Sequence, residues 1–416
     1  MTSHAQASSE RHVHPWIFLV LILPFGVIGG YLQTTLGYLL TQQHVPVSAT
    51  AGLIALGFVP HTWKFLWAPI ADTTLSRKAW YTIGAVLTSA GILVMGFLPT
   101  TAAGLKLLGL AAFVANLAVT FLGMSVESLM AYSTSESEKG RAGGWFQAGN
   151  LGGTGVGGGL GLILAQRLAA PWMAGAILAG ACLLCVLALA FVPDTSTHQR
   201  HPSLAKSLKE VVLDVWKVSR AKLGAIALIL CFLPIGSGAA SGLWAAVAGD
   251  WHASANTVAL ATGVITGLVS AVGCLAGGWL SDRMNRKGAY VLYGVMQALC
   301  AAAMALSPRT ERMFIVFTIL YAFITGLTYA GFTAFVLEAM GTGAAATKYS
   351  VFASLSNSPI WYMTLIDGWA HTRWGSRGML EVEAVCCILG LVLFGGVLAA
   401  MPKRRTLAAV GAAPPL

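Results

Sequence analysis

The stretch GGWLSDRMNRK, residues 277–287, ends a long apolar segment with an aspartate that is followed by basic residues. An earlier stretch, TWKFLWAPIADTTLSRK at residues 62–78, also runs from apolar residues through an aspartate to a basic pair. Asp72 and Asp282 are 210 residues apart. A charged turn that recurs at the end of two apolar segments indicates that the chain consists of two related halves.

The composition excludes a soluble globular protein. Of the 416 residues, 56% are hydrophobic and only 10% are charged, whereas a soluble domain carries about 25% charged residues. So few charges leave too little polar surface to cover a globule in water. The chain is therefore expected to cross a lipid bilayer several times.

Apolar segments of about 20 residues, the length of a helix that crosses a bilayer, recur twelve times. The predicted spans are 15–40, 47–71, 79–98, 104–132, 142–169, 171–192, 222–247, 254–281, 288–307, 311–340, 346–371 and 377–401. The first span is too long for the apolar core of a cleavable signal peptide. The sequence thus predicts an all-α membrane protein with twelve transmembrane helices.

Basic residues are distributed unevenly between the two sets of connections. One side holds eighteen lysines and arginines and the other holds six, while Lys64 belongs to neither. Cytoplasmic connections are enriched in basic residues, so both termini are expected to be cytoplasmic in an inner (plasma) membrane. This bias explains the net charge of +10, which gives no reason to expect a nucleic acid as partner.

One long polar connection divides the chain. The predicted parts are an N-terminal six-helix bundle at 1–192, a cytoplasmic linker at 193–221 and a C-terminal six-helix bundle at 222–416. The apolar residues that would share one helical face of the linker are Leu204, Leu208, Val211, Val212 and Val215. This pattern suits a helix on the membrane surface, and a solvated linker is an equally acceptable interpretation.

Two further matches extend the repeat. LPFG at 23–26 recurs as LPIG at 233–236, and the TFLGMS segment that begins at Thr120 matches the TYAGFT segment that begins at Thr328. Two parallel six-helix repeats joined by a cytoplasmic loop are the architecture of the major facilitator transporters. The sequence therefore predicts the major facilitator fold.

The second charged turn resembles the loop signature of that superfamily, which lies between helices two and three and again between helices eight and nine. The residues on its positions are Gly278, Asp282, Arg283, Arg286 and Lys287, and the first half retains only Asp72, Arg77 and Lys78. Asn285 replaces a usual glycine, a mild departure because asparagine tolerates the left-handed conformation. The resemblance implies a gating role. The alternative to gating is that the basic residues only set the orientation in the membrane and the aspartate only caps a helix.

A glycine run, GNLGGTGVGGGLG at 149–161, has the spacing of a dinucleotide-binding loop, but that motif needs a preceding strand and a soluble helix. The run instead places small residues at successive i+4 positions: Gly149, Gly153, Gly157 and Gly161. Span eight carries Gly263, Gly267, Gly273 and Gly277. In the facilitator fold helices five and eight meet across the halves, so these faces are expected to slide during gating, unless they only pack tightly.

Two stretches of the first half resemble the AmpG-like muropeptide permeases and the related acetyl-CoA transporters. KFLWAPIAD at 64–72 matches the Lys, Trp-Ala/Ser-Pro and Asp of their second helix, and the turn at 138–141 matches their Glu-Lys/Arg-Gly-Arg sequence. The resemblance implies proton-driven uptake. Bacterial AmpG-type permeases often have two extra spans, and shorter relatives include siderophore importers, so muropeptide itself is less firmly implied.

Lys64 and Glu127 stand inside apolar segments of the first half. A lysine in hydrocarbon costs about 2.5–3.5 kcal/mol on insertion scales, so it normally faces a partner or a wet cavity. Lys64 lies about 12 Å along the helix from Asp72. Unless it snorkels to the cytoplasm, we expect it to face the central cavity and to attract an anionic substrate or pair with a carboxylate.

Glu127 is the carboxylate expected to couple transport to protons. The repeat equivalents of Lys64 and Glu127 are Cys274 and Phe335. Because these charges belong to one half only, they suggest substrate or proton handling rather than shared mechanics. Asp367 and Glu338 are the next candidates for the coupling role. His61 either shares the face of Lys64 or is merely interfacial.

The sequence predicts a monomeric secondary transporter that takes up a small-molecule or small-peptide substrate by symport with protons. The expected substrate is a sizeable anionic or amphiphilic solute, muropeptide-like or siderophore-like. The aromatic residues expected in its cavity are Tyr31, Trp63, Trp244 and Trp361. An acyl-CoA or drug and metabolite carrier is the alternative, and a channel or receptor fits the paired repeats less well. An intramembrane enzyme is disfavoured because HExxH and GxSxG motifs are absent, and no catalytic residue, metal or cofactor is expected.

Overall fold

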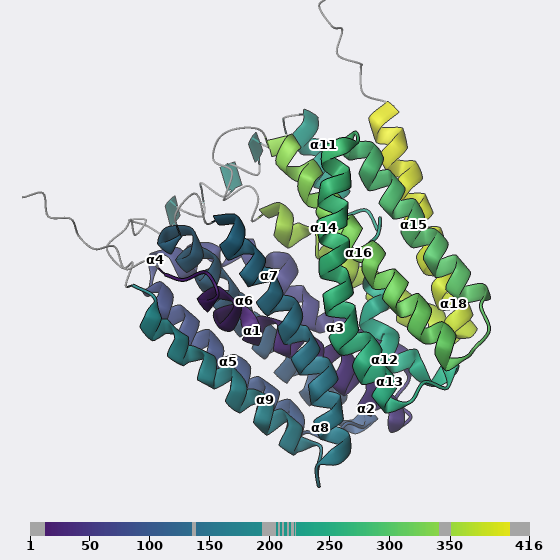
Figure 1. The fold of residues 1–416 in the computed structure, drawn as a ribbon, viewed down its shortest axis with the longest axis horizontal. Helices are drawn as coiled ribbons and strands as arrows, with labels where there is room; N and C mark the ends of the chain where they lie inside the picture. Colours follow the sequence, from purple (N-terminus) through teal and green to yellow (C-terminus); the bar gives the residue numbers. More distant parts are fainter. Residues whose placement is uncertain are drawn as a thin grey trace, which may run out of the picture.

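The computed structural model describes residues 13–134, 139–193, 222–340 and 351–399, together with isolated positions between 205 and 220. Within these ranges every regular element is a helix. The helices form two bundles, coloured purple to teal and green to yellow in Figure 1. Apart from Val212, the predicted apolar face of the linker lies outside the described residues.

The helices follow the order that the repeat requires. The N-terminal bundle contains α1 (Ile17–Gly30), η1 (Tyr31–Leu36), α2 (Gly37–Gln42), α3 (Val47–Trp63), η2 (Lys64–Leu66), α4 (Ala68–Thr73), α5 (Arg77–Phe97), η3 (Ala102–Gly104), α6 (Leu105–Ser133), α7 (Lys139–Gly155), η5 (Val156–Leu160), α8 (Gly161–Arg167), α9 (Trp172–Leu184) and η6 (Cys185–Phe191). The C-terminal bundle contains α11 (Lys222–Leu230), η7 (Ala239–Leu243), α12 (Trp244–Val247), η8 (Ala248–Trp251), α13 (Ala255–Val258), η9 (Ala259–Ile265), α14 (Thr266–Arg283), α15 (Arg286–Leu306), α16 (Glu311–Met340) and α18 (Ser358–Ala399).

Eight helical stretches of the described residues are long and apolar enough to cross a membrane. They are Ile17–Gln42, Arg77–Phe97, Ala102–Ser133, Trp172–Phe191, Ala255–Arg283, Arg286–Leu306, Glu311–Phe332 and Val351–Ala399. The last stretch has 49 residues and contains predicted spans eleven and twelve, because α18 is two helices joined across a kink at Gly375. Predicted spans two and seven do not form single long helices because each is interrupted. Span five is helical throughout from Lys139 to Arg167 but is not among the eight stretches.

Each interruption has a local cause. Span two contains Pro60 near the end of α3 and Pro69 at the start of α4, and proline removes a backbone donor and clashes with the preceding turn. Span seven breaks between α11 and η7, where Gly236 has φ 58° and Gly238 has φ 73°, values that glycine adopts without strain. Span five is not broken but passes through the π-helical turn η5, as spans one and eight pass through η1 and η9.

The third helix of each half starts and packs in the same way. Ser76 caps α5 by accepting a hydrogen bond from the Ala79 N–H at 3.2 Å, and Asn285 caps α15 by accepting one from the Lys287 N–H at 3.0 Å. Asn285 has φ −61° and ψ 120°. The expected left-handed conformation is therefore wrong, and this asparagine serves as a helix cap.

Two tyrosines repeat this symmetry inside the bundles. The Tyr81 hydroxyl on α5 donates to the Leu21 carbonyl at 2.9 Å, and the Tyr290 hydroxyl on α15 donates to the Ile235 carbonyl at 3.2 Å. Each bond ties the third span of a half to its first span. The internal repeat read from the sequence is thus present in the packing.

The two bundles contact each other toward one end of their spans. We call the end that holds turns 74–76 and 284–285 the charged-turn face, and the other end the opposite face. Near the opposite face η5 lies on η9, where a Cβ added to Gly263 would be 2.6 Å from the Gly159 Cα. There α18 also packs on α3, where a Cβ added to Gly368 would overlap the Ala51 side chain. Figure 1 shows α2, α12 and α13 gathered where the bundles meet.

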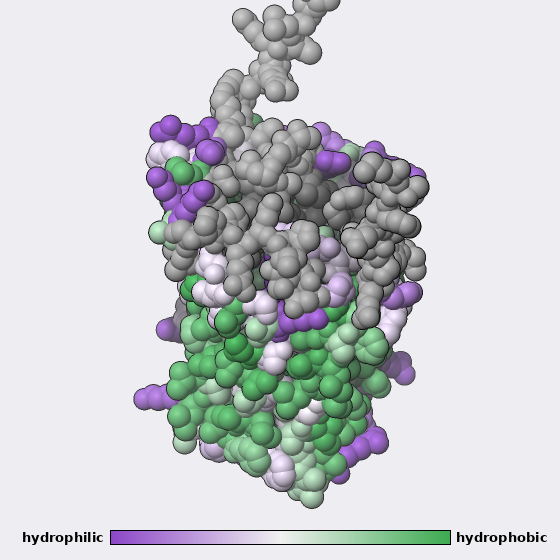
Figure 2. Space-filling view, turned by 90° about the vertical axis from the view of Figure 1, so that its left-hand side faces the viewer, coloured by the Kyte–Doolittle hydropathy of each residue, from purple (hydrophilic) through white to green (hydrophobic). Residues whose placement is uncertain are grey.

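The outer surface is suited to lipid. Large exposed hydrophobic side chains include Leu184, Leu187 and Phe191 in the first half and Leu268 and Leu275 in the second. Figure 2 shows a broad apolar area on one face of the molecule, with polar residues concentrated beyond its edges. This surface is that of a protein that crosses a membrane many times.

Candidate functional site

The ion pair between Lys64 and Glu127 lies where span two breaks. α3 ends one residue before Lys64, which begins the 3-10 turn η2. The Lys64 Nζ donates to Glu127 Oε1 on α6 at 3.3 Å. The lysine side chain is 13% exposed and the glutamate side chain is 43% exposed. The two charges that the sequence singles out are therefore in contact, and one of them is open to water.

Polar contacts flank this pair along the interface of span two with α6. His61 Nε2 lies 3.0 Å from Asn116 Oδ1, so His61 shares the polar side of the break. The Trp67 indole N–H donates to Thr120 Oγ1 at 3.0 Å. Together these contacts fix the break against α6, and they orient the lysine between them.

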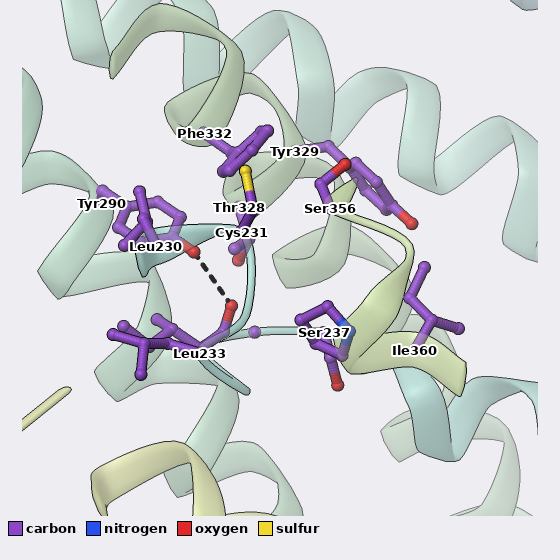
Figure 3. A pocket seen from close by; sticks show the side chains of 13 residues that line it. Leu230, Cys231, Leu233, Ser237, Tyr290, Thr328, Tyr329, Phe332, Ser356 and Ile360 are labelled. Atoms are coloured by element: carbon purple, nitrogen blue, oxygen red, sulfur yellow. Dashed lines mark hydrogen bonds between the residues drawn. The ribbon is translucent and has the colours of Figure 1, made fainter. Parts of the chain in front are cut away.

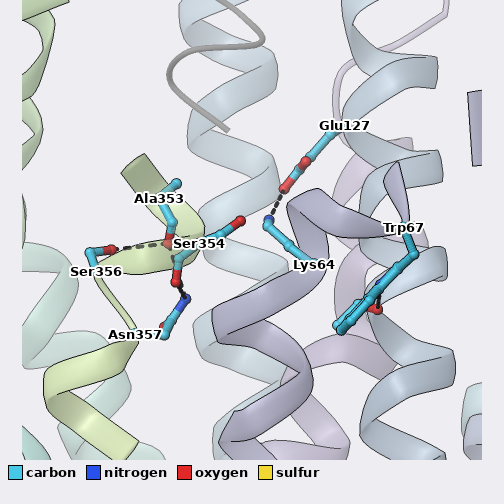
Figure 4. A network of polar contacts seen from close by, with 8 residues as sticks. Lys64, Trp67, Glu127, Ala353, Ser354, Ser356 and Asn357 are labelled. Atoms are coloured by element: carbon cyan, nitrogen blue, oxygen red, sulfur yellow. Dashed lines mark hydrogen bonds and ion pairs between the residues drawn. The ribbon is translucent and has the colours of Figure 1, made fainter. Parts of the chain in front are cut away.

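The second half faces the ion pair across the space between the bundles. Figure 4 shows Lys64 and Glu127 on one side and residues 353–357 on the other, with the Ser354 side chain directed toward the pair. Asn357 donates to the Ala353 carbonyl at 3.0 Å. In this view the ion pair lies on the side of the first half that is directed toward the second half.

The four predicted cavity aromatics fall in different surroundings. Tyr31 and Trp244 are each 1% exposed and belong to the packed core, so in this conformation they line no open cavity. Trp244 packs edge-on against Tyr321 with ring centroids 5.2 Å apart. Trp63 is 41% exposed, and Trp361 is partly buried. A substrate-binding role for these residues remains a prediction.

A separate pocket lies within the second half, beside the break in span seven. Figure 3 shows Tyr290, Tyr329 and Phe332 along one side of it, with Ser237 and Ser356 also at its wall. Its lining has no charged residue. The four aromatic residues predicted from the sequence do not line it, and it is distinct from the Lys64–Glu127 site.

The residues of the first charged turn make contacts that join neighbouring helices. The Arg77 guanidinium lies 4.2 Å from the centroid of the Tyr132 ring, and the Lys78 Nζ donates to the Val192 carbonyl at 2.6 Å. These contacts link the start of α5 to the end of α6 and to the end of span six. The Asp72 side chain lies outside the described residues.

The second charged turn is more open. The Arg283 guanidinium lies 3.9 Å from the Trp279 ring centroid. Arg286 and Lys287 start α15 and are partly buried. Asp282 is exposed, and its side chain has no hydrogen bond or ion pair within the described part of the chain. If this turn acts in gating, Asp282 finds its partner in another conformation.

This arrangement predicts the direction of an Asp282→Asn effect. The change removes no contact here but weakens any conformation in which the carboxylate is paired. The variant should therefore favour the conformation described here, and cysteines placed on the charged-turn face should label faster than in the unsubstituted protein. Membrane insertion should be unchanged. Equal labelling together with normal transport would leave the aspartate only a role in topology.

The glycine stripe of span five packs differently from the prediction. A Cβ on Gly153 or Gly157 would overlap α1 backbone atoms, at Leu23 and Val27 respectively. These two glycines therefore serve packing within the first half, and their predicted place at the interface with span eight is wrong. Spans five and eight do meet, but through Gly155 and Gly159 on the adjoining side of the helix.

Sequence reasoning named Asp367 but missed that it lies beside a second buried carboxyl group, Glu383, in the second half. Asp367 is 0% exposed and Glu383 is 3% exposed. Asp367 had been considered only as a substitute for Glu127, and Glu383 lies six residues into a predicted span, where it resembles an interfacial charge. The side chain of Glu338, the other substitute, lies outside the described residues.

The fold and the site define a membrane carrier with two six-helix halves around a central polar site. Residues 62–362 match the family model of the Major Facilitator Superfamily. The match covers well over half of the chain, and the protein belongs to this superfamily. It is a multi-pass membrane transporter, not an enzyme.

Known proteins resemble it at low identity. The anhydromuropeptide permease of Escherichia coli K12 is 24% identical over 393 residues, which cover 89% of this chain and 76% of that protein. The nucleoside transporter NupG has a TM-score of 0.72 at 13% identity, with 93% of this chain and 99% of NupG covered. The E. coli xylose transporter XylE, in a partially occluded inward-open conformation, gives 0.68 at 13% identity, with 95% and 99% covered. These structures support the fold alone.

Proposed function

We propose that the protein is a proton-coupled importer of a sizeable anionic or amphiphilic solute, muropeptide-like or siderophore-like, that works by alternating access in the inner membrane. The observation that carries this proposal is the Lys64–Glu127 ion pair at the break of span two, in which the lysine is 13% and the glutamate 43% exposed. The likeness to the anhydromuropeptide permease over most of the chain supports the substrate class.

The pair offers a simple exchange of counter-charges. With no substrate bound, the Lys64 ammonium balances the charge of the Glu127 carboxylate. The Lys64 Nζ lies 3.3 Å from Glu127 Oε1. An anionic substrate that engages Lys64 takes away this counter-charge, and a proton on Glu127 replaces it. Since a nearby opposite charge favours the ionised form of a carboxyl group, loss of the ammonium favours protonation of Glu127, and substrate and proton bind together.

The conformation fits a carrier that faces the cytoplasm. The basic turns mark the charged-turn face as cytoplasmic. The bundles meet through Gly159 and Gly263 near the opposite face, and Glu127 keeps an exposed side chain near the other end of α6. In this proposal both termini lie in the cytoplasm, and the protein works as a monomer with its cavity open inward.

Competition between substrates tests the proposed class. Vesicles that contain the protein should take up a labelled anhydromuropeptide or a labelled ferric siderophore, and unlabelled compound of the same class should compete. An acyl-CoA should not compete. Uptake of acyl-CoA, or of neutral metabolites alone, would replace the proposal with the alternative carrier of the same fold.

A Lys64→Ala variant should weaken both uptake and substrate exchange, because the ammonium both attracts the anion and balances Glu127. Partly exposed ion pairs contribute only about 0–1 kcal/mol to stability, so the variant should fold. Lys106→Ala, which removes an exposed lysine near the opposite face, is the matched control and should transport normally. If Lys64→Ala and Lys106→Ala transport substrate equally well, Lys64 does not take part in substrate binding or coupling.

A further inference from the structure

The kink in α18 places two carboxyl groups at the same depth. Asp367 stands eight residues before Gly375 and Glu383 eight residues after it. Because the two parts of α18 run in opposite directions from the kink, each carboxyl lies about 12 Å from the turn. Both side chains are buried, and they are within hydrogen-bonding reach of each other.

The donors available to these groups are few. The Tyr321 hydroxyl donates to Glu383 Oε1 at 2.8 Å. In the described part of the chain no donor reaches Glu383 Oε2 or either oxygen of Asp367. A hydrogen bond between two carboxyl groups requires a proton on one of them, so the geometry itself calls for a proton at this position.

Among the described residues no lysine or arginine pairs with these two carboxyls, and His371, four residues after Asp367, lies 2.9 Å from Asp250 instead. The groups that face the pair are Tyr321 from α16 and Tyr362, Cys386 and Cys387 from α18 itself. Gln297 on α15 approaches Tyr321, and its amide donates to Thr325 at 3.3 Å. Residues 47–51 of α3, which include the contacts of Gly368, contain no titratable side chain, and neither do residues 239–243 of η7, which packs on α18. Two negative charges buried together without a cation are strongly unfavourable.

The pair also lies beside a contact between the two halves. The next residue after Asp367 is Gly368, which packs against Ser48 and Ala51 of α3. This contact belongs to the opposite face, where the bundles meet. Separation of α3 from α18 at that contact would bring water close to Asp367, and hydration would allow both carboxyls to ionise.

We propose that Asp367 and Glu383 form a proton-binding site of the second half, which holds one proton while the opposite face is closed and releases it to the medium on that side when the face opens. The site is separate from Lys64 and Glu127 and needs no substrate. A low pH of the medium at the opposite face therefore stabilises the conformation described here. For a site that binds one proton, the closed-to-open ratio changes by at most about tenfold per pH unit.

Infrared difference spectroscopy tests the proton directly. When the pH of the purified protein in liposomes is raised, the unsubstituted protein should lose a protonated-carboxyl band, and Asp367→Asn and Glu383→Gln should each lack that change. Glu381→Gln, on the same helix but 48% exposed and paired with Arg377 at 2.7 Å, should retain it. If both Asp367→Asn and Glu383→Gln still lose this band when the pH is raised, as the unsubstituted protein does, the proposal is overturned.

Accessibility of Ser48→Cys to an impermeant maleimide, with the seven native cysteines replaced, tests the link to conformation. Because the thiolate is the reactive form, the rate at each pH is divided by that of the same cysteine in denatured protein. This ratio should rise with pH in the parent and should stay low and constant when Asp367→Asn and Glu383→Gln are combined. The same pH response in the combined variant would contradict the link. A response to sodium chloride at constant pH, in place of a response to pH, would assign the site to sodium and overturn the proposal.

Discussion

Replacing Glu127 by glutamine should abolish proton-driven accumulation of substrate and leave exchange of substrate down its own gradient partly intact. The amide keeps the size of the side chain and can still meet Lys64, but it cannot take up a proton. Transport by this variant should therefore stop at equal concentrations on the two sides of the membrane. The loss is complete for accumulation, which makes this one of the two largest effects expected for the protein.

The measurement compares accumulation and exchange in the same vesicles with an imposed pH gradient. Glu381→Gln is a matched control, because Glu381 is 48% exposed and also pairs with a basic side chain, whereas Glu127 is 43% exposed. The control should accumulate substrate like the unsubstituted protein. If Glu127→Gln still accumulates substrate against a gradient, the coupling carboxylate lies elsewhere, with Asp367 as the next candidate.

The second large effect is expected for Gly159→Leu. A Cβ at this position would lie 2.7 Å from the Ala259 carbonyl oxygen across the interface between the halves. Backbone atoms cannot move aside as a flexible side chain can, so the leucine should exclude the contact of η5 with η9. The variant should fold, open its opposite face and lose most of its transport.

Distances between spin labels on the two halves measure this opening. Gly152→Leu is the control, since no atom lies within 4 Å of a Cβ at that position, and its distances should match those of the parent. Gly153→Leu should instead disturb packing on α1 and lower the yield of folded protein. Parent-like distances and transport in Gly159→Leu would show that close approach of these helices is not required.

Much of the fold could be predicted from local features of the sequence. Span length and apolar content are properties of short segments, and the repeat is visible because Asp72 and Asp282 stand at equivalent turns. The breaks in spans two and seven follow from Pro60, Pro69 and the glycines near 236. The stripe of glycines identified a small-residue face of span five but could not reveal its neighbour, since the helix carries glycines on two sides.

The site was predictable only in part. Lys64 and Glu127 are conspicuous because each is a charge in an apolar segment, although their contact across 63 residues depends on how α3 and α6 pack. The sequence named Asp367 only as a substitute for Glu127 and gave Glu383 no role, because the boundary predicted at 377 placed Glu383 near the membrane surface. The kink at Gly375 instead folds both into the interior. Tyr31 and Trp244 show a related difficulty, because in a sequence the aromatic residues of a packed core resemble those of a cavity.

Transport by the purified protein in liposomes tests the central claim most directly. With an acidic exterior and a neutral interior, a labelled anhydromuropeptide or ferric siderophore should accumulate above its external concentration, and a protonophore should abolish that accumulation. Uptake that stops at equal concentrations despite the gradient, or that ignores the protonophore, would contradict a proton-coupled carrier.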